Sequence, residues 1–372
     1  MLHVEICDNT RKGLKPFIEL PFHLYRDDPN WVPPLISYQY QTLLGQNNLF
    51  GKTSRALVLY DEDQPVARVL AGYDEKQNAL SGQKKGSLAL FECAPGLDYA
   101  RVILDEACAY LKARGLEYVT GPDRVTTDGL TKGILTEGFD MPPVLLNPYN
   151  PPIYKTYFEK NGFTKYRDYY AFKFEMENFD PSVYGQISAR AQKRFGFRVE
   201  HINISSKNEK RLVNDLCKVI TTAFPQVAEF FKPDEQDILR SYKLLRQLSR
   251  PEMAVMAYSG NEPIGVLVAF PDYNRVLKKI KGNANPWNKL RYYFINKHIT
   301  GARCNLQFVV PEWQNKGVNL SMLYEVYTSS RRLGMRWFEC SSVDETATTL
   351  ISSIENLGCV KYKTYTRFGK AL

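Results

Sequence analysis

The residues best suited to hold a reactive ligand lie in the loop 314–319, Gln-Asn-Lys-Gly-Val-Asn. The alternating residues before it predict a strand that ends at Pro311, because proline has no amide hydrogen to donate. Apolar residues at helical spacing follow the loop and predict a helix that stops near Gly334. A helix N-terminus offers unpaired amides and a positive dipole end, so this loop, with Lys316 and the flexible Gly317, suits a phosphate or pyrophosphate. An ordinary turn in which Gly317 only relieves backbone strain fits the same residues.

Histidines and cysteines indicate no other chemistry. The chain has four histidines, none at a metal-ligand or nucleophile–base spacing, so histidine catalysis is not expected: His3, His23, His201 and His298. Its seven cysteines are odd in number and form no Cys-x-x-Cys pair: Cys7, Cys93, Cys108, Cys217, Cys304, Cys340 and Cys359. We therefore predict neither a disulfide framework nor a metal site, and expect most cysteines to be small buried side chains.

The bulk composition is that of a soluble globular protein. At 372 residues, with 44% hydrophobic and 24% charged residues, the chain has room for two domains. No apolar run approaches the ~20 residues of a membrane-spanning helix, and the first residues lack the order of a secretory signal, so a cytoplasmic location is expected. The net charge of +9 favours an anionic partner, and coenzyme A, a nucleic acid such as tRNA or an acidic membrane surface fits it equally well.

Two similar series of elements are predicted along the chain. The first has strands over 55–60, 66–73 and 87–93, a helix over 99–113 and a strand over 117–120. A basic helical linker over 180–198 precedes the second. The second has a strand over 199–204, helices near 210–223 and 233–248, a hairpin over 253–258 and 263–270, the strand–loop–helix, and then a strand over 336–341, a helix near 346–356 and a strand over 360–368. In the first series the turn 94–98 carries Asp98 and no paired small residues, so it should bind pyrophosphate poorly.

Two further segments have unusual composition. The proline-rich segment 26–35 must run extended, and its Trp31 is interpreted as an anchor on the core. The segment 273–300 mixes lysines and arginines with aromatic residues. It could lie on a membrane surface, grip coenzyme A or meet an anionic acceptor. The favoured interpretation is a helix whose aromatic side chains pack while its lysines stay solvated.

The loop and the strand before it resemble a known family. Val-Val-Pro-Glu-Trp-Gln-Asn-Lys-Gly-Val-Asn, residues 309–319, resembles the acyl-CoA-binding segment of the GNAT acyltransferase superfamily, with Gln314 and Gly317 at matching positions and Asn319 where that family has a small residue. The phrases 25–34 and 148–152 are similar to those of bacterial tandem GNAT proteins. This resemblance implies an α+β chain of two tandem GNAT-like domains, over 1–180 and 181–372, each a mixed, mostly antiparallel sheet flanked by helices.

The resemblance also implies an activity. The implied activity is acyl-CoA-dependent N-acyl transfer, with acetyl-CoA as the expected donor and with direct transfer to an unknown small-molecule amine. The strand 308–310 would pair with pantetheine and the amides of 314–320 would hold the pyrophosphate. The donor-binding residues would then be Phe308, Val309, Val310, Gln314, Asn315, Lys316, Gly317, Val318, Asn319 and Leu320.

An amine must lose a proton before it attacks, and the superfamily often adds a tyrosine that protonates the leaving thiolate. In this chain Ile354 stands at the position of that tyrosine. The candidates for acid–base catalysis are Glu339, Glu312 and then Tyr324, although the carboxylates fit surface charges and Tyr324 fits the core equally well. Two alternatives stay open: a non-catalytic binding protein that kept the fold, and a transferase that uses long-chain acyl-CoA or aminoacyl-tRNA.

Overall fold

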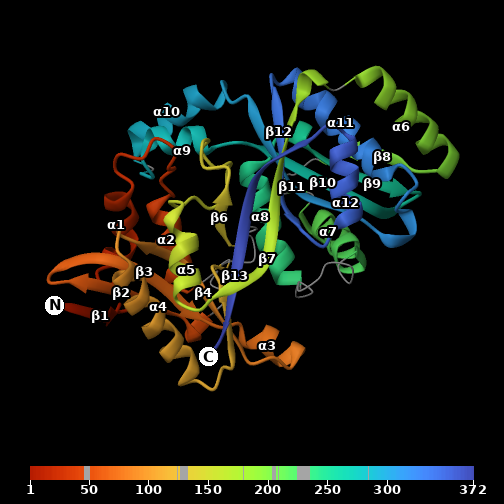
Figure 1. Cartoon of the computed structure of the whole chain (residues 1–372). Coiled ribbons are helices and arrows are strands. Elements are labelled where there is room, and N and C mark those ends of the chain that lie inside the picture. Colours follow the sequence, from red (N-terminus) through yellow and green to blue (C-terminus); the bar gives the residue numbers. More distant parts are fainter. Residues whose placement is uncertain are drawn as a thin grey trace.

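The computed structural model describes residues 1–45, 51–123, 125, 133–178, 180–202, 207, 209–223, 235–283 and 285–372 (Figure 1). Its first half contains β1 (Leu2–Ile6), α1 (Lys15–Leu24), α2 (Ile36–Leu43), β2 (Arg55–Asp61), β3 (Gln64–Gly72), α3 (Glu75–Ser81), β4 (Lys85–Cys93), α4 (Leu97–Lys112), β5 (Tyr118–Gly121), β6 (Ile134–Glu137), α5 (Ile153–Lys160) and β7 (Thr164–Glu175). These elements match the predicted first series to within a few residues.

The second half begins with the predicted basic helix and repeats the order. It contains α6 (Pro181–Phe195), β8 (Arg198–His201), α7 (Glu209–Ala223), α8 (Glu235–Leu248), β9 (Ala254–Ser259), β10 (Glu262–Pro271), α9 (Asn274–Ile280), α10 (Pro286–Asn296), β11 (Gly301–Val309), the short 3-10 helix η6 (Pro311–Trp313), α11 (Val318–Arg332), β12 (Trp337–Asp344), α12 (Thr348–Asn356) and β13 (Val360–Ala371). Residues 203–204 and 233–234, at the ends of a predicted strand and a predicted helix, lie outside the described residues.

All thirteen strands of the described residues form one sheet, in the order β1-β2-β3-β4-β5-β13-β7-β12-β11-β10-β9-β8, with β6 also paired to β13. The two halves use the same pattern. Strands β2, β3 and β4 are antiparallel and β4 pairs with β5 in parallel, while β9, β10 and β11 are antiparallel and β11 pairs with β12 in parallel. The predicted tandem arrangement of mixed, mostly antiparallel strands flanked by helices is therefore confirmed.

The halves exchange their last strands. Strand β13 from the end of the chain lies between β5 and β7, and β7 from the first half lies between β13 and β12. Figure 1 shows β7 and β13 running side by side through the middle of the molecule. Each half of the sequence therefore completes the sheet of the other.

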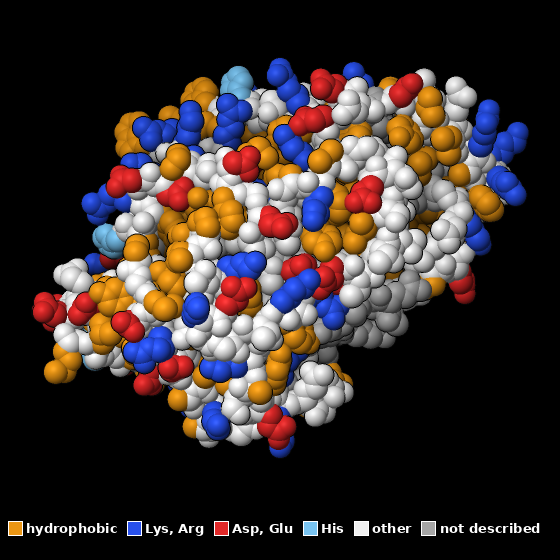
Figure 2. Space-filling model, in the orientation of Figure 1, with side chains coloured by type: hydrophobic (Ala, Val, Ile, Leu, Met, Phe, Trp, Pro, Cys, Tyr) orange, Lys and Arg blue, Asp and Glu red, His pale blue; other side chains and the backbone are white. Residues whose placement is uncertain are grey.

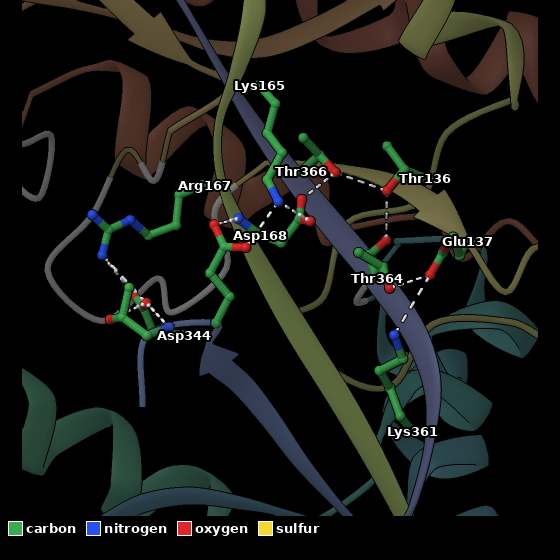
Figure 3. A network of polar contacts seen from close by, with 11 residues as sticks. Thr136, Glu137, Lys165, Arg167, Asp168, Asp344, Lys361, Thr364 and Thr366 are labelled. Atoms are coloured by element: carbon green, nitrogen blue, oxygen red, sulfur yellow. Dashed lines mark hydrogen bonds and ion pairs between the residues drawn. The ribbon is translucent and has the colours of Figure 1, made fainter. Parts of the chain in front are cut away.

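Polar contacts bridge this junction (Figure 3). The Lys165 amino group lies 2.6 Å from the Asp168 carboxylate and 2.8 Å from that of Glu345, and the Thr366 hydroxyl donates to Asp168 at 2.7 Å. These side chains come from β7, β13 and the turn after β12. Partly exposed ion pairs of this kind each contribute roughly 0–1 kcal/mol, so they add little to the stability of the exchanged strands.

The proline-rich segment is an anchor, as predicted. The ring of Trp31 stacks on Tyr25 with centroids 5.2 Å apart and meets Phe22 edge-on. Asp28 accepts a hydrogen bond of 2.8 Å from the Tyr149 hydroxyl, so the two phrases that resemble tandem GNAT proteins contact each other. Within the part of the chain that the structure describes, no helix is both long and apolar enough to cross a bilayer.

Candidate functional site

The strands β11 and β12 diverge. They pair in parallel only from Gly301 to Cys304, opposite Trp337 to Cys340. Beyond that point β11 continues along β10, with Val309 opposite Gly265, while β12 continues along β7. Among the described residues no strand pairs with the β12-facing edge of 305–309. We call the segments 305–309 and 341–344 the C-terminal fork; its β11 edge is where an extended ligand would pair with the backbone.

A pocket opens into this fork between α11 and α12. Most of its walls are apolar, and they are formed by Gln307, Asn319, Leu323, Tyr327, Cys340, Leu350, Ser353, Ile354, Leu357 and Cys359. The Gln307 amide donates to the side-chain oxygen of Asn319 in the wall. This bond directs the Asn319 side chain toward β11, so the larger residue at this position is accommodated inside the fork.

The loop before α11 exposes amides at the mouth of the fork. Asn315 and Gly317 have left-handed φ values of 60° and 79°. The first intrahelical bond runs from Ser321 to the Gly317 carbonyl at 3.0 Å, which leaves the three preceding amides without an intrahelical acceptor. No side chain of the described residues caps α11. The Lys316 amino group lies 4.9 Å from the centre of the Trp313 ring, beside these amides, and the whole arrangement suits a pyrophosphate.

Gly317 also allows a close helix contact. A Cβ placed on it would lie only 2.7 Å from the Cβ of Ala191 on α6. The helix α6 therefore crosses directly over this turn, and the exposed side chains of Arg190, Lys193 and Arg194 lie on the same helix. Both the ligand-binding and the strain-relief interpretation of this glycine are compatible with its geometry.

The equivalent fork in the first half is filled. Strands β4 and β5 pair only over Lys85–Ser87 and Tyr118–Thr120 before they separate. Two tyrosines of α5 enter the gap: Tyr154 accepts a hydrogen bond of 2.7 Å from the Cys93 amide, and Tyr157 accepts one of 2.9 Å from the Gly96 amide. Tyr154 is 1% exposed. In the first half, aromatic side chains therefore bond to the backbone amides that correspond to the proposed ligand-binding positions of the C-terminal fork.

A buried polar cluster lies at the apex of the C-terminal fork. Glu339, opposite Arg303 in the register, is 0% exposed. Its carboxylate accepts a hydrogen bond of 2.7 Å from the Asn147 side chain and further bonds from the hydroxyls of Ser341 and Tyr362. We call these five residues the Glu339 cluster. Because neighbours on a strand alternate between faces, Glu339 lies on the opposite side of the sheet from Cys340 and the pocket.

Burial controls the ionisation of the groups around Glu339. It raises the pKa of the Tyr362 phenol far above its ordinary value, and the charge of Glu339 adds to this shift. Burial lowers the pKa of Arg303, while the charge of Glu339 opposes that change. Arg303 donates to the Leu145 carbonyl and, at 3.1 Å, to that of Ser341. Tyr362 therefore remains protonated and acts as a donor to the carboxylate.

The buried Asp272, directly after β10, should make the stability of the fold depend on pH. Burial raises its pKa to about 7, although the amides of Leu145 and Asn274 donate to it. The folded state thus holds this proton more tightly than the unfolded chain does. The contribution of protonated Asp272 to the free energy of unfolding is complete below pH ~4 and disappears as the pH rises through 7, with an upper limit of about 4 kcal/mol.

Replacing Asp272 by asparagine removes this titration. We expect the free energy of unfolding of Asp272→Asn, measured by urea denaturation, to fall less between pH 5 and pH 8 than that of the wild type. Asp27→Asn, which alters an exposed carboxylate, should keep the wild-type pH dependence. Equal pH slopes for Asp272→Asn and the wild type would contradict this assignment.

The structure places the three acid–base candidates apart. Glu339 lies in the buried cluster, whereas Glu312 is exposed on η6, beyond the far end of β11. Tyr324 lies on α11 beside α6, where a Cβ on Gly185 would come within 2.9 Å of its hydroxyl. The wall of the pocket contains none of the three. Glu339 differs from the other two because it lies in a buried polar cluster at the apex of the fork.

The donor-binding candidates gather around the fork and its loop. Phe308 and Val309 form its β11 edge, and buried Val310 donates its amide to Ile264 at 3.0 Å. The Gln314 side chain donates to the Val309 carbonyl at 3.3 Å. The remaining candidates are in the loop and the first turn of α11: Asn315, Lys316, Gly317, Val318, Asn319 and Leu320.

The partners of Glu339 were not among the residues predicted from the sequence. Asn147 comes from the Leu-Asn-Pro-Tyr-Asn-Pro-Pro segment, Arg303 from β11 and Tyr362 from β13. A weak signal existed for Arg303, a charged residue in a strand whose neighbours are small and apolar. None existed for Tyr362, because β13 reads as an alternating strand with many polar residues.

Comparisons with known proteins settle the fold. No family model matches the chain. A solved structure described as a tandem GNAT protein from the clavulanic acid biosynthesis pathway superposes with a TM-score of 0.60 and 10% identity, over 100% of this chain and 98% of that one. This chain has the tandem GNAT fold. A second solved structure, a GCN5-related N-acetyltransferase from Sphaerobacter thermophilus, superposes on this chain with a TM-score of 0.55 and 11% identity, over 100% of this chain and 95% of that one.

Two curated proteins are similar in sequence to this chain along almost its entire length. One, from Caulobacter vibrioides, is named bacterial ceramide synthase and is 26% identical over 375 residues, covering 98% of this chain and 96% of its own. The other is protein YghO from Escherichia coli, 24% identical over 98% of this chain and 94% of its own. The alignments extend through both halves and therefore include both forks.

Proposed function

We propose that this protein is an N-acyltransferase that binds an acyl-CoA in its C-terminal fork and transfers the acyl group directly to an amine. The observation that carries the proposal is the difference between the two forks. In the first half Tyr154 and Tyr157 occupy the backbone amides. In the second half no strand of the described residues pairs with the β12-facing edge of β11, and no described side chain caps the first turn of α11.

The residues of the C-terminal fork fit such a donor. The amides of Val318, Asn319 and Leu320, with Lys316 beside them, would hold the pyrophosphate. The edge 305–309 would bond the amides of the pantetheine arm. The side-chain oxygen of Asn305, at the apex, is buried and has no partner among the described residues, so it offers one more acceptor there. The bound thioester supplies the activated acyl group, and the protein supplies position and polarity.

A charge reversal in the loop tests donor binding. Lys316→Glu should weaken coenzyme A binding by roughly tenfold or more, because an attractive charge near the pyrophosphate becomes a repulsive one. Isothermal titration with coenzyme A measures this. Lys155→Glu, on α5 next to the filled fork, is the matched control and should bind as the wild type does. Unchanged affinity in Lys316→Glu would place the donor elsewhere.

The Glu339 cluster is the proposed destination of the amine's proton. An ammonium group has no lone pair, so the acceptor must be deprotonated before it attacks. Tyr362 is only half-buried and already donates to Glu339, so it can relay a proton from an acceptor to the carboxylate. Asn147 and Ser341 also donate to that carboxylate, and we assign the relay to Tyr362 because its hydroxyl can both receive a proton and pass one on.

The similarity to a protein named bacterial ceramide synthase supports a long acyl chain over the acetyl group expected from the sequence, because a ceramide is the amide of a fatty acid with a long-chain amino alcohol. The pocket of the fork has apolar side chains of α11 and α12 in its wall, but its volume of about 20 Å³ is too small to select a chain length. We therefore propose a long-chain acyl-CoA as donor and a lipid amine as acceptor.

Release of free thiol from the donor tests this specificity. The protein should consume palmitoyl-CoA in the presence of a sphingoid base at least tenfold faster than acetyl-CoA, and mass spectrometry should find the amide product. A preference for acetyl-CoA would restore the original expectation. Binding of coenzyme A without turnover of either donor would favour a non-catalytic binding protein.

A further inference from the structure

The segment 273–300 concentrates positive charge. It contains seven lysines and arginines and not one aspartate or glutamate: Arg275, Lys278, Lys279, Lys281, Lys289, Arg291 and Lys297. It forms α9 and α10, and most of the described basic side chains in it are exposed. Such a cluster attracts an anionic surface within about a Debye length, roughly 8 Å at physiological salt.

Large apolar side chains project outward from α10 among these charges. Trp287 is 77% exposed, Leu290 52% and Phe294 61%. Their spacing of three and four residues places them on one face of the helix. Figure 2 shows hydrophobic and basic side chains next to each other over α9 and α10, at the upper left of the molecule. The favoured sequence interpretation, in which the aromatic residues pack, is therefore wrong for Trp287.

The other face of α10 fixes the helix to the protein. The Asn288 side chain donates to the carbonyls of Ile280 and Asn283 at 3.2 and 2.7 Å, and Tyr292 stacks on Tyr273. Arg250 donates to the last carbonyl of the helix, that of Asn296, at 3.0 Å. The helix is thus held at several points while its outer apolar face remains in solvent.

We propose that the outer face of α10 and the basic residues around it bind the surface of a lipid bilayer that contains anionic headgroups. Tryptophan, leucine and phenylalanine beside lysine and arginine form the pattern of a helix that lies in the interface. The apolar side chains enter the headgroup boundary, and the cations meet the lipid phosphates. The charge of the segment is complementary to such a surface throughout.

The surface is connected to the Glu339 cluster. Asp272, just before α9, accepts a hydrogen bond from the Leu145 amide, and the Asn274 side chain donates to the Pro143 carbonyl at 2.7 Å. Asn147 of the cluster follows two residues after Leu145. A bilayer under α10 would thus lie near the acceptor side of the fork. Delivery of a lipid amine from the bilayer to the fork rests on the proposed function, whereas binding of α10 to the bilayer does not.

Sedimentation with vesicles tests the proposal on the full chain. The wild type should sediment with vesicles of phosphatidylcholine and phosphatidylglycerol in equal parts, and much less with phosphatidylcholine alone. Trp287→Ser combined with Leu290→Ser should lower the partition coefficient by about tenfold or more, because two large apolar groups no longer enter the interface. Added salt should also weaken the wild-type interaction.

A matched control separates this surface from general hydrophobicity. Val183→Ser combined with Ile187→Ser removes two apolar side chains of α6 that are 50% and 43% exposed, and should bind vesicles as the wild type does. The proposal is overturned if the wild type stays in the supernatant with the anionic vesicles, or if both double variants bind equally well. A wild type that dimerises through Trp287 and Leu290 and ignores vesicles would overturn it in favour of an interface between two copies.

Discussion

Glu339→Gln should lower kcat for N-acylation by about 10²–10⁴-fold, the usual contribution of a positioned general base. Glutamine keeps the size of the side chain and can still accept from Asn147, but it takes up no proton at neutral pH. Donor binding should remain as in the wild type, because the loop before α11 is not altered. Initial rates with saturating donor, together with coenzyme A titration, separate the two effects.

Two further variants make this test specific. Tyr362→Phe removes the proposed relay and leaves Glu339 with two donors, Asn147 and Ser341, so the kcat of this variant should also fall while the fold is kept. Glu312→Gln alters the exposed candidate on η6 and should change the rate by less than about twofold. If Glu339→Gln keeps wild-type kcat, the carboxylate is structural and the proton has another destination.

The two halves of the sequence should not fold separately. A chain of residues 1–180 lacks β13, and a chain of residues 181–372 lacks β7, so each has lost a central strand of its sheet. Strand β7 brings the buried Phe172 and Phe174 to the core of the second half, and β13 brings Phe368 to that of the first, where it stacks on Phe158 at 5.3 Å. Each such burial is worth about 1.5–3 kcal/mol, against a total stability of about 5–15 kcal/mol.

Expression of the halves checks this prediction. Each alone should be insoluble or lack a cooperative thermal transition, whereas the two expressed together should copurify as one complex. A full chain with a protease site inserted near residue 180 is the control, since cleavage there leaves both exchanged strands in place and should preserve the transition. Cooperative unfolding of either half alone would mean that the strand exchange is dispensable and that the predicted domains are independent.

The sequence by itself determined the elements and the candidate loop. Alternation in β11, proline at its end and helical spacing after Gly317 are local signals, and local signals suffice because hydrogen bonding within a strand or helix follows from neighbouring residues. The repeated order of elements had the same origin. The turn after β4 was expected to bind pyrophosphate poorly from its own residues, which include Asp98 and lack paired small residues, before any neighbour of that turn was known.

The tertiary structure decided which neighbours these elements meet. Tyr154 and Tyr157 fill the first fork from a helix some sixty residues away along the chain, as the sequence separation of 61 for the Cys93 bond records. The Glu339 cluster joins β11, β12, β13 and a loop of the first half. Periodicity reports which side of an element is apolar but not what covers it, and this is why Glu339 was read equally well as a surface charge and Trp287 as a packed side chain. Only the packing of segments distant in sequence buried the first and exposed the second.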